Sequence, residues 1–291
     1  MIGRDGAYGS AVTAPVVVGL VLVRDENVFV ERTVRNVAGF CDRLFLADHS
    51  SRDGTAEILA RLADELPHAS FHSVPHPGTP HRLVEGYAGE RAWVFGVDGD
   101  EIYDSLGLAG FRERLVGGEF DDWFSLRSAQ LHCRRLDVSS GRARGWLAPP
   151  ARTTTKLYNF GALEAWDGPV PDRLHGGRVV FRDDPPRDGR LVVDEGSWET
   201  SPFRCLHTCF LRRSTRQPRR EVARHDYGER GEGGRRVQVV KRARRLVRRP
   251  ERSRRKLTRY TRGEEVEVDV AAFFADADAD RLAPSLVNLW T

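Results

Sequence analysis

Three carboxylates follow a short apolar stretch in the first half of the sequence. Residues 93–97 are apolar and have the length of a buried strand, and Asp98, Asp100 and Glu101 come directly after them. Carboxylates repel one another, and a hard divalent cation such as Mg²⁺ or Mn²⁺, which prefers oxygen ligands, would offset their charge. Side chains at i and i+2 of an extended segment point the same way, so Asp98 and Asp100 are predicted to face one ion. The alternative is a solvated acidic turn after a buried strand.

Two other apolar stretches also end in polar residues. Residues 16–23 are followed by the polar segment 24–27, and residues 44–47 are followed by the segment 48–55. In the second polar segment, Asp, Ser and Thr suit the start of a helix, and Gly54 allows a tight backbone path. Taken alone, this segment is equally well explained as a capped loop between a strand and a helix.

The expected strands alternate with helical patterns. Apolar residues recur at helical spacing after the first two strands, at Val30, Val34, Val37 and Ala38 and again at Ile58, Leu59, Leu62 and Leu66. Residues 69–74 form a third expected strand and residues 93–97 a fourth. This order predicts an α/β fold with a mostly parallel central sheet flanked by helices. Because ligands bind beyond the carboxyl ends of parallel strands, the three polar segments should open on one edge.

These segments resemble the motifs of one enzyme family. The segment from Asp48 to Thr55 resembles the D-x-S-S/T-D-G-T signature of family 2 glycosyltransferases, which have the GT-A fold. Residues 97–101 are similar to the L-D-A-D-E form of the DxD motif in that family. Residues 23–27 resemble its opening strand and polar "N-E" loop. The resemblance covers about residues 15 to 120, with three motifs in order.

The resemblance implies a nucleotide-diphosphate-sugar donor, a divalent cofactor (Mn²⁺ or Mg²⁺) and an inverting transfer to a hydroxyl acceptor. It implies that Asp48 contacts the base, that Asp98 contacts the ribose or the metal, and that Asp100 holds the metal that bridges the two phosphates. The same likeness places Asp25, Glu26, Ser50 and Asp53 in the donor site. The acceptor class, whether polysaccharide, lipid-linked or small molecule, stays open.

Later motifs supply candidates for the base and a further metal ligand. Residues 166–175 look like the "W-x-G-x-V-H-E-x-L" segment of one branch of the family, with Asp172 in the place of the expected Glu. Asp172 is therefore the first candidate for the base that deprotonates the acceptor, and Glu195 is the second. His207 resembles the His of a late "L-x-H" motif, which implies a ligand that completes the metal shell. The alternatives are a Pro-rich turn at Asp172 and a structural histidine.

The predicted organisation has three parts. Residues 1–14 form a flexible leader, and residues 15–211 form a GT-A domain with a nucleotide-sugar half (15–120) and an acceptor half (121–211). Within it we expect a helix over residues 106–115, strands from residue 123 and over residues 153–160, and a variable loop up to residue 150. Residues 212–291 form an Arg-rich helical extension and an acidic tail.

The charge is concentrated in one segment. Between Arg204 and Arg262 there are 22 Lys or Arg residues and 5 acidic residues, although the whole chain has a net charge of only +4. A basic amphipathic helix is expected from near Arg235 to Pro250. It could meet an anionic membrane surface or an anionic acceptor, or pack against the acidic body. The acidic tail from Gly263 is expected to fold back on this basic segment.

Other features restrict the class of protein. Four scattered cysteines without a CxxC pair favour a reduced compartment, and no second half-site completes a zinc site at Cys205 and Cys209. The longest apolar run, residues 16–23, is too short to cross a bilayer. A cytoplasmic location is therefore expected, with peripheral contact at the inner membrane face as an alternative.

The sequence leaves two rival functions open. A nucleotidyltransferase usually carries a loop rich in Gly and Lys or Arg after its first strand, and none occurs between Val23 and Asn27. A non-enzymatic binder of nucleic acid through residues 204–262 would need no metal and would depend steeply on salt. Apart from Phe210 near its start, only Tyr227 and Tyr260 are available for base stacking in that segment, which makes nucleic acid a disfavoured partner.

Overall fold

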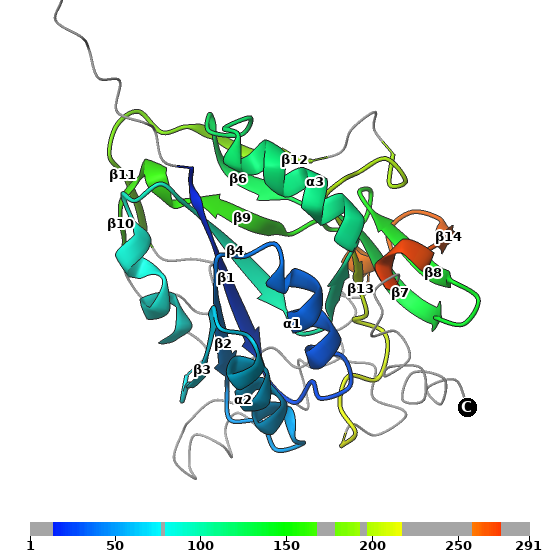
Figure 1. The fold of residues 1–291 in the computed structure, drawn as a ribbon. Helices are drawn as coiled ribbons and strands as arrows, with labels where there is room; N and C mark the ends of the chain where they lie inside the picture. Colours follow the sequence, from blue (N-terminus) through cyan, green and yellow to red (C-terminus); the bar gives the residue numbers. More distant parts are fainter. Residues whose placement is uncertain (1–13, 77–78, 168–177, 193–196, 217–257, 275–291) are drawn as a thin grey trace, which may run out of the picture.

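A computed structural model describes residues 14–76, 79–167, 178–192, 197–216 and 258–274 of the chain. The chain has a mixed α/β fold with a seven-stranded sheet, a five-stranded sheet and a two-stranded sheet (Figure 1). The expected leader and the basic amphipathic helix at 235–250 lie outside the described residues. None of the described helices has the length and apolar character needed to cross a bilayer.

The seven-stranded sheet has the order β12-β6-β9-β4-β1-β2-β3. Its strands are β1 (Val16–Val23), β2 (Arg43–Asp48), β3 (Ala69–Ser73), β4 (Ala92–Asp98), β6 (Trp123–Arg127), β9 (Thr155–Asn159) and β12 (Arg187–Leu191). Among these strands β9 alone runs against the others, because it pairs antiparallel with both β4 and β6 while the remaining pairs are parallel. The predicted mostly parallel sheet is therefore confirmed.

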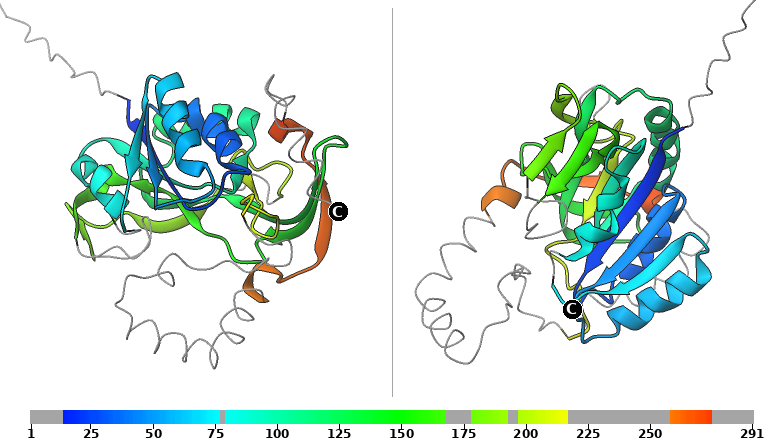
Figure 2. Two further views of the ribbon diagram at one scale, coloured as in Figure 1. Left: turned by 90° about the horizontal axis from the view of Figure 1, so that it is seen from below. Right: turned by 90° about the vertical axis from the view of Figure 1, so that its left-hand side faces the viewer.

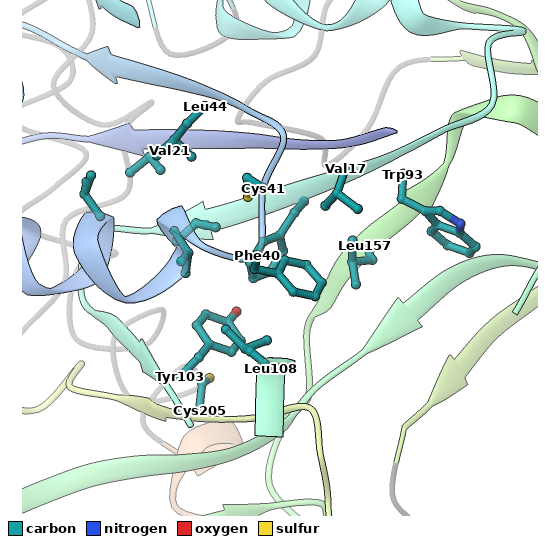
Figure 3. Packing of buried hydrophobic residues seen from close by; sticks show 14 of the residues in the cluster. Val17, Val21, Phe40, Cys41, Leu44, Trp93, Tyr103, Leu108, Leu157 and Cys205 are labelled. Carbon is teal, nitrogen blue, oxygen red and sulfur yellow. The ribbon is translucent and has the colours of Figure 1, made fainter. Parts of the chain in front are cut away.

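Three helices pack on one face of this sheet: α1 (Val30–Ala38), α2 (Thr55–Glu65) and α3 (Ser105–Val116). Their apolar residues form one core with alternate residues of β1, β2 and β4 (Figures 1 and 3). The opposite face is covered by the hairpin of β10 (Leu163–Asp167) and β11 (Arg178–Phe181) and by short 3₁₀ turns. Because both faces are covered, the interior of β1 is almost wholly apolar.

The five-stranded sheet has the order β14-β8-β7-β13-β5. Its strands are β5 (Glu101–Tyr103), β7 (Ala129–Asp137), β8 (Arg142–Ala148), β13 (Arg204–His207) and β14 (Glu265–Asp269). The variable loop expected up to residue 150 is wrong, because β7 and β8 form an antiparallel hairpin there. The Arg and Gly content suggested a loop, but exposed arginines alternate with buried residues at the start of β8, as in a strand with one covered face.

Strand β14 falls within the segment predicted to be an acidic tail. It pairs antiparallel with β8 and so completes the edge of the second sheet (Figure 2). Glu265 lies 3.0 Å from Arg134 and 3.7 Å from Arg144, and Glu267 lies 3.6 Å from Arg142. Glu265 and Glu267 thus face arginines of the β7–β8 hairpin. Most of the basic segment 204–262 lies outside the described residues, so the predicted contact of the tail with it stays a prediction.

Candidate active site at the carboxyl ends of β1, β2 and β4

The three polar segments meet at one edge of the central sheet. Strand β1 lies between β2 and β4 and runs parallel to both, with Val23 opposite Asp48 and Leu22 opposite Asp98. The carboxyl ends of the three strands are therefore neighbours. The predicted convergence of the polar segments is confirmed at the level of the backbone.

Hydrogen bonds join the loop after β1 to the loop after β2. The backbone N–H of Asp25 donates to Oγ of Ser51 at 2.9 Å, and Oδ1 of Asp25 accepts from the backbone N–H of Arg52 at 2.8 Å. The backbone N–H of Glu26 donates to the Thr55 hydroxyl at 2.9 Å. Asp25 (φ 52°) and the exposed Ser50 (φ 55°) both adopt the left-handed backbone region, which non-glycine residues seldom occupy. These contacts fix the shape of the edge.

Asp48 and Asp53 have different surroundings in this edge. Oδ1 of Asp53 accepts from Thr55, and its Oδ2 accepts from the hydroxyl of Ser214 at 2.5 Å, so this carboxylate holds the loops together. Asp48 is buried, and its Oδ2 accepts from the backbone N–H of Ser51 at 3.0 Å. Burial raises the pKa of Asp48. Its second oxygen, Oδ1, is also buried and accepts no hydrogen bond from the described residues.

Asp98 forms part of a closed ionic group. Its Oδ2 lies 3.0 Å from Nζ of Lys156, which also lies 2.5 Å from Oε1 of Glu101. Oε2 of Glu101 accepts hydrogen bonds from the backbone N–H of Asp98 and from the Tyr103 hydroxyl, both at 3.2 Å. Burial raises the pKa of Tyr103, so this hydroxyl keeps its proton and donates it. The whole group is buried.

The carboxylate of Asp100 lies near a histidine and an arginine. Its Oδ2 lies 3.8 Å from Nε2 of His207 and 3.6 Å from Nη1 of Arg213. The same Arg213 nitrogen lies 2.8 Å from Oε1 of Glu26. The main-chain carbonyl of Asp100 accepts from the backbone N–H and the hydroxyl of Thr208, at 2.8 and 3.0 Å. The backbone of Asp100 is thus anchored to the residue after β13, and its carboxylate lies near both His207 and Arg213.

The prediction that Asp98 and Asp100 point the same way assumed that residues 98–100 are extended, and they are not. Strand β4 ends at Asp98, and Gly99 and Asp100 form a turn before β5 begins at Glu101. A turn breaks the two-residue periodicity of an extended strand. Asp98 contacts Lys156, and Asp100 lies near His207 and Arg213. Gly99 is required in this turn because a Cβ there would collide with the side chains of Glu26 and Val23.

His207 joins this site through the second sheet. Strand β13 pairs antiparallel with β5, with His207 opposite Glu101, and parallel with β7, with His207 opposite His132. Nδ1 of His207 lies 3.0 Å from Nδ1 of His132. The two imidazoles and Cys209 form a buried group whose potential ligand atoms lie within 4.8 Å of one another. Sequence spacing did not reveal this group, because His132 is 75 residues from His207.

A divalent ion suits one part of this site better than the other. The oxygen of Asp100 and the ring nitrogen of His207 face each other at 3.8 Å, and both atom types bind Mn²⁺ or a similar ion. By contrast, Oδ2 of Asp98 already contacts Lys156. Asp100 and His207 are therefore the residues that fit such an ion, while Asp98 would have to share its carboxylate with a lysine.

Sequence reasoning missed the two cations that contact the buried carboxylates. Lys156 is one of three lysines in the chain and stands inside an otherwise apolar and Thr-rich strand. A buried lysine needs a carboxylate partner, so its position was a usable signal. Arg213 gave no such signal, because it is one of many arginines in its region.

Two predicted residues cannot be placed. Asp172 and Glu195, the candidate bases, lie outside the described residues, in the ranges 168–177 and 193–196.

Comparisons with known proteins give partial likenesses only. No protein-family model and no curated protein matches the chain. Glucosyl-3-phosphoglycerate synthase from Mycobacterium tuberculosis, in complex with Mn²⁺, UDP and glucosyl-3-phosphoglycerate, is 18% identical over 40% of this chain and 44% of that chain, with a TM-score of 0.31. A mannosyltransferase from Pyrobaculum calidifontis in complex with GDP-Man and Mn²⁺ is 13% identical over 64% of this chain and 59% of that chain, with a TM-score of 0.37.

Mannose-6-phosphate isomerase from Helicobacter pylori is also similar in part, at 8% identity over 50% of this chain and 71% of that chain, with a TM-score of 0.34. The chain spans less than two thirds of the length of both transferase structures. At these scores the likenesses assign neither a family nor an activity to the chain.

Proposed function

We propose that this protein is a metal-dependent glycosyltransferase that moves a sugar from a nucleotide-diphosphate-sugar donor to a hydroxyl acceptor with inversion. The observation that carries the proposal is the meeting of three polar segments at the carboxyl ends of β1, β2 and β4. Donor, metal and acceptor would then share one edge of a mostly parallel sheet, where such sheets bind ligands.

Asp48 is the proposed contact for the base of the donor. Its buried Oδ1 accepts no hydrogen bond from the described residues, while Oδ2 is held by Ser51. A buried carboxylate oxygen gains stability from a donor, and an N–H group of a nucleobase is such a donor. Asp25, Ser50 and Asp53 would shape the loops around the base.

Asp100 and His207 are the proposed metal ligands, and Asp98 is the residue that would approach the ribose or the metal beside Lys156. The bound cation would supply charge that stabilises the departing diphosphate. Arg213, which is itself paired with Glu26, would hold Asp100 in place. Asp172, with Glu195 as the second choice, is proposed to take the proton of the acceptor hydroxyl as that oxygen attacks the anomeric carbon.

A thermal-shift screen tests the donor and metal requirement together. Nucleoside diphosphates would be added to the full chain with and without Mn²⁺, and the change in unfolding temperature would be measured. The proposal predicts stabilisation that depends on both the nucleotide and the ion. Stabilisation by polynucleotides alone, lost at high salt, would instead support a nucleic-acid binder.

Asp100→Asn is the sharpest variant for this site. It removes the charge but keeps the size, and the contacts of Thr208 to the main-chain carbonyl do not depend on the side chain. We expect loss of the Mn²⁺-dependent nucleotide shift and a fall in sugar transfer of at least about 100-fold, with the fold retained. Asp137→Asn, at an exposed position at the end of β7, serves as the control. Equal transfer by Asp100→Asn and the wild type would remove the metal from the mechanism.

A further inference from the structure

Two histidines from neighbouring strands contact each other next to Asp100. His132 on β7 and His207 on β13 are opposite each other in a parallel pair, and their Nδ1 atoms lie 3.0 Å apart. Both side chains are buried. At this distance one Nδ1 donates a hydrogen bond and the other accepts it.

The partner of the first ring decides which nitrogen donates. Nε2 of His132 lies 2.9 Å from the main-chain carbonyl oxygen of Arg152. A carbonyl oxygen only accepts, so Nε2 of His132 carries a proton. A neutral imidazole has one N–H, which leaves Nδ1 of His132 as an acceptor. With His132 neutral, Nδ1 of His207 is therefore the donor of the bond between the two rings.

The same proton assignment determines the other nitrogen of His207 when that ring is neutral. With its one proton on Nδ1, His207 presents the lone pair of Nε2, which lies 3.8 Å from Oδ2 of Asp100. A lone pair and a carboxylate oxygen repel each other, and a cation between them turns this repulsion into shared coordination.

We propose that His132 is a positioning residue that holds His207 in its Nδ1–H form and so makes Nε2 a ligand for the divalent cation shared with Asp100. The inference rests on the proposed function for the identity of that cation. His132 itself contacts neither the ion nor the donor. It acts as the hydrogen-bonded partners of metal-binding histidines generally do, by fixing the tautomer and the orientation of the ring.

Cys209 offers a rival arrangement. It lies with the two imidazoles in a group that could bind a soft ion such as Zn²⁺. Such an ion would need a lone pair on Nδ1 of both rings if it used the atoms that now face each other, and the hydrogen bond between them would be lost. The 3.0 Å separation and the carbonyl contact of His132 favour the hydrogen-bonded pair.

Ring-nitrogen NMR tests the proton assignment without any metal. The full chain would be labelled with ¹⁵N-histidine, and the signals of residues 132 and 207 would be assigned from the His132→Asn and His207→Asn variants. We expect His132 in the Nε2–H form and His207 in the Nδ1–H form. A proton on Nε2 of His207, whether in the neutral or the charged ring, would overturn the inference.

Metal affinity tests the consequence, with Mn²⁺ as the probe and the EPR signal of free Mn²⁺ as the readout. His132→Leu removes the acceptor, and we expect Mn²⁺ binding to weaken about 10- to 100-fold. His132→Asn can keep an acceptor near the place of Nδ1 and should restore most of the affinity. Cys209→Ser should bind Mn²⁺ as the wild type does. Thermal unfolding of each variant separates loss of the ion from loss of the fold.

The outcomes separate this inference from the proposed function. If the wild type binds Mn²⁺ and His132→Leu binds it equally well, the inference fails and the proposed function stands. If the wild type binds no Mn²⁺, the proposed function fails, and the inference fails with it. If Zn²⁺ binds tightly and both His132→Leu and Cys209→Ser abolish its binding, the soft-ion site replaces the proposed histidine pair.

Discussion

Asp98 and Asp100 stand two residues apart in the sequence, but their carboxylates lie in different electrostatic surroundings. Asp98 contacts Lys156 at 3.0 Å, and Glu101 contacts the same amine at 2.5 Å. Oδ2 of Asp100 lies 3.6 Å from Nη1 of Arg213, which also contacts Glu26, and 3.8 Å from Nε2 of His207. The first group compensates its carboxylates with a buried lysine. The second combines an arginine shared with Glu26 and an imidazole that is charged only when protonated.

This difference separates a structural role from a binding role. A buried charge must be compensated, and a protein cation in direct contact does so permanently. A histidine that is charged only when protonated can instead bind a metal ion as a neutral ligand, and the ion then supplies the compensating charge. The lysine also shows that three carboxylates at a strand end do not by themselves require a metal. The case for a metal therefore rests on Asp100 and His207.

The largest loss of stability is expected from Lys156→Met, which removes the amine shared by Asp98 and Glu101. The substitution leaves Asp98 and Glu101 buried without the amine that they share, and removing one partner of a buried ion pair typically costs about 3–5 kcal/mol. The free energy of unfolding measured by urea denaturation checks this.

The matched control is Arg61→Met. Arg61 also contacts two carboxylates, Glu31 and Glu65, both at 2.7 Å, but its side chain is 45% exposed. Water compensates these charges when the arginine is lost, so the stability should change far less. Equal effects of the two substitutions would mean that Lys156 is not a buried counter-ion.

A smaller loss of stability is expected from Arg213→Met, which changes the surroundings of Asp100. Nη1 of Arg213 lies 2.8 Å from Glu26 and 3.6 Å from Asp100, and the arginine side chain is 16% exposed to water. Loss of one charged hydrogen bond of this kind costs about 1.5–3 kcal/mol. Urea denaturation of both variants shows which substitution lowers the free energy of unfolding more. A larger loss of stability for Arg213→Met than for Lys156→Met would contradict the view that Lys156 is the buried counter-ion and that Arg213 is the less critical one.

The fold near β1 could be predicted because short-range patterns determine it. Apolar runs of strand length alternate with helical spacing over residues 16–98, and the structure has strands and helices in the expected order. The polar strand ends could be predicted for the same reason, since parallel strands bring their carboxyl ends to one edge.

The partners of the carboxylates could not be predicted in this way. Lys156 reaches Asp98 from β9 and His132 reaches His207 from β7, across 58 and 75 residues. These contacts depend on how the strands are ordered within each sheet, and no local pattern encodes that order. The hairpin of β7 and β8 was missed because arginines on the exposed positions of β8 gave it the composition of a loop.

The smallest effect on stability is expected from Asp48→Asn, and it should depend on pH. Burial raises the pKa of Asp48 above its value in the unfolded chain, so the folded state binds a proton more tightly. The stability contributed by this carboxyl is present at low pH and is lost as the pH rises through the raised pKa. Asparagine stays neutral and can still accept from Ser51. The stability of Asp48→Asn relative to the wild type should therefore increase with pH across this window and then level off.

Asp137→Asn is expected to show the opposite dependence of stability on pH, and it therefore serves as the matched comparison for Asp48→Asn. Hydrogen bonds from Ser139 and Ser140 lower the pKa of Asp137, because they stabilise the charged form. Its contribution to stability is present above the ordinary pKa and is lost as the pH falls through the lowered pKa. Relative to the wild type, Asp137→Asn should become less stable as the pH rises, while Asp48→Asn becomes more stable. Urea denaturation from pH 3 to 7 measures both, and parallel slopes would contradict the assignment of Asp48 as a carboxylate that burial disfavours.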